Sequence, residues 1–184
     1  MAVIATFSAL NVATNYALTS FPNIKLFDTL VFISALLFGL DVGLAVAVLS
    51  WLVYGSVNPW GAASLYFIAF LAASETVYAF LGWSARRVRF NGSAERSLTF
   101  GLMGIVGALI YDLNTIATPL VVAGYQITTA FLYLFNPATL LFMAAHEVSD
   151  FVFFSTVAPI LMVAIRRLVP TWLVTSKIAE AASG

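Results

Sequence analysis

The sequence contains no cysteine and only one histidine, His146. The absence of cysteine excludes disulfide bonds, thiolate catalysis and metal sites with sulfur ligands. A single imidazole is too few for a metal cage built from nitrogen and sulfur ligands. We therefore expect the chain to hold neither a metal ion nor any other resident cofactor.

Charged residues are also scarce, at 9% of the 184 residues, whereas 62% of the residues are hydrophobic and the mean hydropathy is +1.01. A soluble domain has about a quarter of its residues charged, and these cover its surface. So few charges indicate that a lipid bilayer contacts most of the outer surface. The formal net charge is zero, so the composition gives no sign of a nucleic-acid partner.

The sequence lacks the local motifs of several enzyme classes. His146-Glu147 is not followed by a second histidine, so the zinc-protease helix is absent. The sequence contains no Gly-x-Ser-x-Gly elbow and no glycine-rich phosphate loop. We expect that the chain is not an enzyme, and an intramembrane enzyme using His146, Glu147 and Asp150 is the alternative.

Apolar runs separated by turn residues recur along the whole chain, and several approach the length needed to cross about 30 Å of hydrocarbon. This pattern predicts an all-α integral membrane protein, a six-transmembrane-helix bundle in one domain over residues 1–184. Asp28 is a candidate N-cap of the second helix, residues 124–136 are expected to form a loop, and the tail after Pro170 is expected to fray. The predicted helices cover residues 2–21, 28–40, 42–54, 62–83, 97–121 and 138–168.

The basic residues predict the topology, because cytoplasmic loops are enriched in Lys and Arg. Six of the eight basic residues lie either between the fourth and fifth predicted helices or at the end of the sixth. With six spans these two places fall on the same side, which predicts a multi-pass protein of the cell membrane with cytoplasmic N- and C-termini. The outer loops would then be residues 22–27, 55–61 and 122–137, rich in proline, asparagine and aromatic residues.

Ionisable side chains inside the predicted spans cost free energy in the membrane, so each is a candidate for a structural or functional role. Glu75, Asp112, His146, Glu147 and Asp150 are the residues concerned, and the last three share one helical face. No Lys or Arg in the spans is available to pair with the acids. We therefore expect the acids to share protons, to bind a polar or cationic ligand, or to hydrogen-bond to hydroxyls and the backbone.

These residues allow structural as well as functional interpretations. For His146 and Glu147, an interhelical hydrogen bond is as good an explanation as ligand binding. For Asp112 we favour a ligand contact or a contact that breaks the helix, because Asn114, Thr115, Thr118 and Pro119 follow closely. We favour a structural or partner-docking role for Glu75.

The first predicted helix has small residues at every fourth position. Ala5, Ala9, Ala13 and Ala17 form a stripe along one face, and such a stripe lets another helix approach closely. Both docking of a partner and packing inside the chain remain open explanations for the stripe. Asn11 and Asn15 lie on a neighbouring face and are expected to point inward.

The order of these features resembles the substrate-binding S component of energy-coupling-factor (ECF) vitamin transporters. The resemblance covers residues 5–168 and extends to the size and the six-span layout. The segments that carry it are the Ala9-x-x-x-Ala13-x-x-x-Ala17 stripe, Ser20-Phe21-Pro22-Asn23, the turn Leu37-Phe38-Gly39-Leu40-Asp41-Val42-Gly43, the loop Tyr54-Gly55-Ser56-Val57-Asn58-Pro59-Trp60-Gly61, and Tyr111-Asp112-Leu113.

The resemblance implies a mechanism. An S component captures its substrate beneath the outer loops, docks through its alanine motif onto a transmembrane coupling subunit powered by two ATPases, and topples to carry the ligand inward. Carried onto this chain, Ala9, Ala13 and Ala17 are the docking residues. The implied ligand-binding residues are Asn23, Asn58, Trp60, Tyr111, Asp112, Asn114, Tyr125, Gln126, His146, Glu147 and Asp150.

The resemblance and the buried residues together leave two substrate classes open. The start Met1-Ala2-Val3 differs from the Met-His start of the nickel and cobalt members, which argues against metal import. The excess of buried acids favours a cationic or amine-bearing vitamin, with Trp60, Tyr111 and Tyr125 available for ring stacking. An uncharged, polar vitamin is the other expectation. The alternative function is a stand-alone proton-linked secondary transporter of a small polar or cationic solute.

Overall fold

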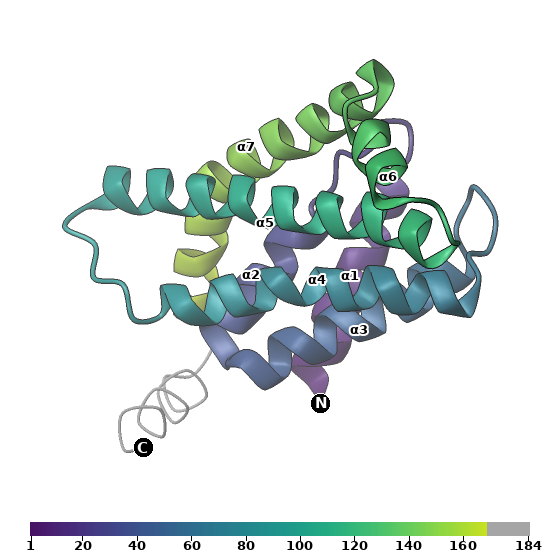
Figure 1. Cartoon of the computed structure of the whole chain (residues 1–184). Helices are drawn as coiled ribbons and strands as arrows, with labels where there is room; N and C mark the ends of the chain where they lie inside the picture. Colours follow the sequence, from purple (N-terminus) through teal and green to yellow (C-terminus); the bar gives the residue numbers. More distant parts are fainter. Residues whose placement is uncertain (169–184) are drawn as a thin grey trace.

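The computed structural model describes residues 1–168, and within this range the chain is all helical, without a strand (Figure 1). The expected tail after Pro170 lies outside the described residues. The helices in chain order are α1 (Ala2–Ala17), α2 (Phe27–Phe38), α3 (Leu40–Ser56), α4 (Leu65–Ala85), α5 (Ser93–Val122), α6 (Ile127–Leu134) and α7 (Pro137–Leu168).

Three of these helices, α4, α5 and α7, are long and apolar enough to cross a membrane. Their 21, 30 and 32 residues correspond to lengths of about 31, 45 and 48 Å. The all-helical fold expected from the sequence is therefore confirmed, and the three candidate spans are consistent with a membrane protein. The helices α1, α2 and α3 are shorter than the membrane thickness, so the number of spans stays a prediction.

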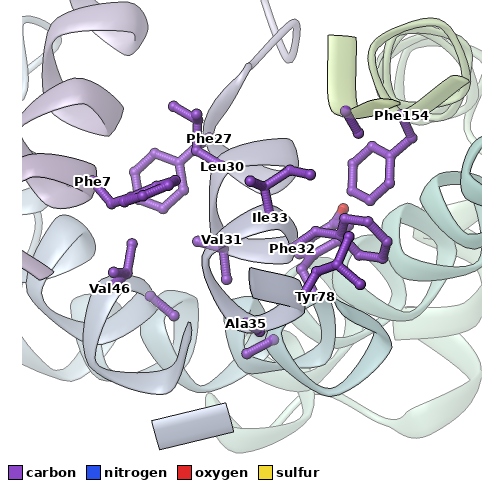
Figure 2. Packing of buried hydrophobic residues seen from close by; sticks show 14 of the residues in the cluster. Phe7, Phe27, Leu30, Val31, Phe32, Ile33, Ala35, Val46, Tyr78 and Phe154 are labelled. Carbon is purple, nitrogen blue, oxygen red and sulfur yellow. The ribbon is translucent and has the colours of Figure 1, made fainter. Parts of the chain in front are cut away.

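Helix α2 forms the centre of the bundle. Every one of its 12 residues is buried, and it packs against α1, α3, α4 and α7. A helix that is apolar on all sides is suited to such a position. Figure 2 shows its side chains in contact with neighbouring helices, and Phe32 packs edge-on against Phe100 and tilted against Phe154.

Two helix boundaries near this centre differ from the sequence prediction. Helix α1 ends at Ala17, because residues 18–26 turn away to form a loop that leads into α2. Asp28 is not the N-cap of α2: Leu26 occupies that position, and Asp28 lies fully buried in the first turn. At the other end of α2, Gly39 has a φ of 109°. This left-handed backbone suits glycine and lets α3 begin at Leu40 without a longer loop.

The segment 124–136, expected to be a loop, contains the short helix α6. Its sequence is rich in β-branched and aromatic residues, which are weak helix formers, so local propensity gave little sign of a helix. Contacts with α5 hold it in place. Most of its large apolar side chains remain exposed, as in a helix that lies at the surface of a bilayer, although Leu134 is buried.

The connecting segments gather at two ends of the bundle (Figure 1). One end holds the loop between α4 and α5 and the end of α7, and both carry arginines; we call it the arginine end. The other end holds the α1–α2 and α3–α4 loops, α6 and the start of α7. We call it the site end, because the cavity described below lies there.

The close packing of α4 on α2 depends on Gly82. A Cβ atom at this position would lie 2.1 Å from the backbone oxygen of Phe32. We expect Gly82→Ala to push the two helices apart and to destabilise the protein by about 1–3 kcal/mol, the usual cost of overpacking. Gly92→Ala is the matched control, because open space surrounds that position. Thermal unfolding in detergent measures both variants, and equal melting temperatures would contradict the prediction.

Candidate functional site

A cavity of about 600 Å³ lies at the site end, beneath the α1–α2 and α3–α4 loops. This volume lies within the range of small-molecule sites. Seven aromatic residues line its walls: Phe21, Trp51, Tyr54, Trp60, Phe67, Tyr111 and Phe142. The polar side chains that line it are Asn15, Thr19, Asn23, Lys25, Asn58, Asp112 and Thr115.

The indole of Trp51 and the ring of Tyr111 form one wall. Their centroids are 6.5 Å apart and their planes differ by 20°. Both residues are almost fully buried, and Tyr54 packs edge-on against Trp51. Because α3 carries Trp51 and α5 carries Tyr111, this wall is fixed by two helices rather than by loops.

Lys25 brings a positive charge to this wall. Its Nζ atom lies 4.3 Å from the centre of the Tyr111 ring and 5.9 Å from that of Trp51, so the ammonium makes a cation–π contact. The same atom is 3.6 Å from Asp28 Oδ1. Burial alone lowers the pKa of Lys25, but the nearby carboxylates, with Asp28 foremost, outweigh it and raise this pKa above its ordinary value. Lys25 is therefore a cation.

His146 bridges two acids beneath the cavity. Its Nδ1 atom is 3.0 Å from Asp112 Oδ1, and its Nε2 atom is 2.9 Å from Asp28 Oδ2. A neutral imidazole has only one N–H donor. Two contacts with carboxyl oxygens therefore require either an imidazolium or a proton on one of the acids. The three residues share that proton between α2, α5 and α7.

Two further acids join the same buried cluster. The Tyr78 hydroxyl donates to Asp150 Oδ2 at 2.9 Å, and that oxygen is 3.8 Å from His146 Nε2. Trp51 Nε1 donates to Glu75 Oε2 at 3.0 Å. The Glu75 carboxyl also interacts with that of Asp28, so Glu75 belongs to this cluster and does not stand apart towards the arginine end. We call Asp28, Glu75, Asp112, His146 and Asp150 the acid cluster.

No Lys or Arg was expected within the spans to pair with the acids, and a basic side chain reaches them from a loop instead. Lys25 lies outside the predicted spans, but the loop between α1 and α2 folds inward and carries its ammonium to Asp28. The physical reason is mutual compensation, because a buried carboxylate and a buried ammonium are each costly alone.

The structure distributes the eleven predicted ligand-binding residues over three places. Those that line the cavity are Asn23, Asn58, Trp60, Tyr111 and Asp112. His146 and Asp150 lie beneath it in the acid cluster. The residues that do not line it are Asn114, Tyr125, Gln126 and Glu147.

The residues away from the cavity have other surroundings. Asn114 hydrogen-bonds to Ser74 and accepts from Thr118, so it joins α4 to α5. Tyr125 and Gln126 are exposed just before α6. Glu147 is half-buried on α7, one position from His146, and its Oε1 atom is buried without a hydrogen-bond partner.

Asn23 and Asn58 shape the loops over the cavity. Asn23 has a φ of 59°, and its Nδ2 atom donates to the backbone oxygen of Phe142 at 2.9 Å. This bond ties the α1–α2 loop to α7. The Oδ1 atom of Asn58 accepts from the backbone N–H of Trp60 at 2.9 Å and fixes the α3–α4 loop.

Two residues of the site carried no clear signal in the sequence. Lys25 follows Pro22-Asn23 in an expected loop, and Trp51 lies in an apolar run. The expectation that Asn11 and Asn15 point inward is confirmed, because both are buried. The spacing of Lys25 and Asp28, one helical turn apart, was the available hint.

Asp28, His146 and Asp150 offer one metal-ligand atom each, and these atoms lie within 4.8 Å of one another. The same atoms already bond to each other and to Tyr78. An ion would have to displace the proton shared between His146 and Asp28 and the Tyr78 hydroxyl. As arranged, the cluster suits proton sharing better than metal binding.

The alanine stripe faces away from the site. Ala5, Ala9, Ala13 and Ala17 are exposed, whereas the opposite face of α1 is buried. Asn11 on that buried face donates to Ser50 Oγ at 3.1 Å. Packing within the described chain therefore does not account for the stripe.

Removal of His146 should leave carboxyl groups buried without their shared proton. We expect His146→Leu to lower the free energy of unfolding by about 3–5 kcal/mol, as for a broken buried ion pair. Glu147→Gln, one position along and outside the cluster, should change it by less than about 1 kcal/mol. Thermal or denaturant unfolding in detergent distinguishes the two, and a stable His146→Leu protein would show that the bridge is not needed.

Comparison with family models, with curated proteins and with solved structures finds no match to this chain. The resemblance to S components therefore stays a hypothesis carried by the residues quoted above. What the chain does must be argued from the cavity and its surroundings.

Proposed function

We propose that the chain is the substrate-capture subunit of an ECF-type importer for a vitamin or related micronutrient. The observation that carries this proposal is the cavity of about 600 Å³ at one end of the bundle, with aromatic walls and a few polar groups. Such a site binds a small organic molecule with most of its surface covered. The proposal assigns no catalytic role to the chain.

The proposed topology has six spans, α1 to α5 and α7, in the cell membrane. The arginines of the α4–α5 loop and of the end of α7 lie at the same end, which the positive-inside rule assigns to the cytoplasm. The cavity lies at the other end and would face outward. Helix α2, of about 18 Å, is enclosed by other helices, so it need not match the bilayer by itself.

The proposed partners are a transmembrane coupling subunit and its pair of ATPases. The exposed alanine stripe on α1 supports this docking, because small side chains let a partner helix approach closely. The substrate site and the stripe occupy different faces of the first helix, since Asn15 lines the cavity while Ala13 and Ala17 face outward.

The second candidate is a proton-linked carrier that works alone. The acid cluster favours it, because Asp112 lines the cavity and shares a proton through His146 with the buried Asp28. Uptake into liposomes that contain only this protein, without ATP, would select the carrier. Absence of uptake despite ligand binding would favour the capture subunit.

Filling the cavity should abolish ligand binding. We expect a member of a vitamin panel to raise the melting temperature of the purified protein and to appear as a bound mass in native mass spectrometry. Ala63→Trp should remove both signals, because Ala63 lines the cavity. Ala62→Trp, at the adjacent exposed position, should keep them. If no panel member binds the wild type, the proposal fails.

A bulky residue in the alanine stripe should block docking without affecting capture. We expect tagged wild-type protein, expressed in its native host, to co-purify with one polytopic subunit and two ATPases. Ala13→Trp should lose these partners and keep its ligand, because the side chain faces away from the cavity. Ala73→Trp, on the exposed face of α4, should keep both. Equal partner recovery from the two variants would refute the docking role.

A further inference from the structure

The cavity has one basic side chain among the described residues that line it, Lys25. Its distance of 3.6 Å from Asp28 Oδ1 is too long for a hydrogen bond. An ammonium has three N–H donors, and the structure gives Lys25 its ion pair and its cation–π contacts but no hydrogen bond. Its donors are therefore available to a molecule in the cavity.

A second donor is unpaired at the same cavity. Asn15 is only 4% exposed, and its Nδ2 atom is buried without a hydrogen-bond partner. Its side chain lines the cavity from α1. A buried donor without a partner costs about 1–3 kcal/mol. A ligand atom that accepts a hydrogen bond from Asn15 Nδ2 would remove this cost.

Each acid of the cluster has one carboxyl oxygen with a partner in the chain and one without a hydrogen bond. Asp112 and Asp28 contact the two nitrogens of His146, Tyr78 donates to Asp150, and Trp51 donates to Glu75. A cationic ligand beside Asp112 would meet the positive charge of Lys25, which already senses that carboxylate. Asp112 Oδ2 has no partner and suits a ligand N–H. These contacts remove the reason for a positively charged ligand.

We propose that the ligand of this cavity is an aromatic compound whose carboxylate, or another anionic acceptor group, is bound by Lys25, with Asn15 as a second donor. The Trp51 and Tyr111 rings supply its stacking surface. This inference rests on the proposed function as a capture site. It reverses the sequence-based preference for a cationic ligand.

Three probes of nearly equal size that differ in charge test the inference. Indole-3-acetate is an anion, indole-3-acetamide is neutral and tryptamine is a cation at neutral pH. Calorimetric titration of the wild-type protein, with empty micelles as the blank, should give the tightest binding for indole-3-acetate. Tighter binding of tryptamine would overturn the inference and leave the capture function standing.

Variants of Lys25 and Asn15 test whether these two side chains bind the anionic group of the ligand. Lys25→Met should weaken indole-3-acetate binding by about 10- to 100-fold, the range for one lost charge-assisted hydrogen bond. The same variant should favour tryptamine, because Asp28 then lacks its cation. Arg87→Met is the matched control, since Arg87 also contacts an aromatic ring, Trp83, but at the arginine end.

Asn15→Leu keeps the test decisive if Lys25→Met does not fold. This variant retains every charge and should weaken indole-3-acetate more than tryptamine. Equal losses for all three probes would refute the assigned acceptor contact. If none of the probes and no vitamin binds the wild type, the proposed capture function itself fails, which is a different outcome from a reversed charge preference.

Discussion

The bridge made by His146 between Asp112 and Asp28 is the interaction on which the site depends. One imidazole contacts carboxyl groups from two other helices, so α2, α5 and α7 meet at a single buried proton-sharing group. Inside a bilayer such groups cannot hydrogen-bond to water, so breaking their bonds to one another would cost free energy. The cluster therefore fixes the floor of the cavity as firmly as apolar packing fixes the centre of α2.

The walls and the floor of the cavity are formed by helices, whereas its roof is formed by loops. Trp51, Tyr111 and Asp112 stand on helices, and the Trp51 indole is also held by Glu75. The roof consists of loops, which are held by a few hydrogen bonds, such as that from Asn23 to the backbone of Phe142, and by the ion pair of Lys25 with Asp28. A rigid floor with a lightly held roof is suited to a site that must admit and release a small molecule.

The sequence predicted the helical membrane fold because composition and long apolar runs report directly on the solvent. It also indicated Asp112, His146 and Asp150, because ionisable residues stand out within apolar helices. It did not predict Lys25 or the burial of Asp28, because both depend on how the α1–α2 loop folds back onto α5. Helix α6 was missed for a similar reason, since contacts with α5 rather than its own residues support it.

Lys25 lies on the α1–α2 loop, forms an ion pair with Asp28 of the acid cluster and lines the cavity. A loop carries the ammonium, whereas a helix carries Asp28. An anionic group in the cavity competes with Asp28 for this ammonium, and Coulomb attraction then draws Lys25 towards the ligand. The same loop is tied to α7 by Asn23, so a ligand bound to Lys25 would contact the loop that forms the roof of the cavity.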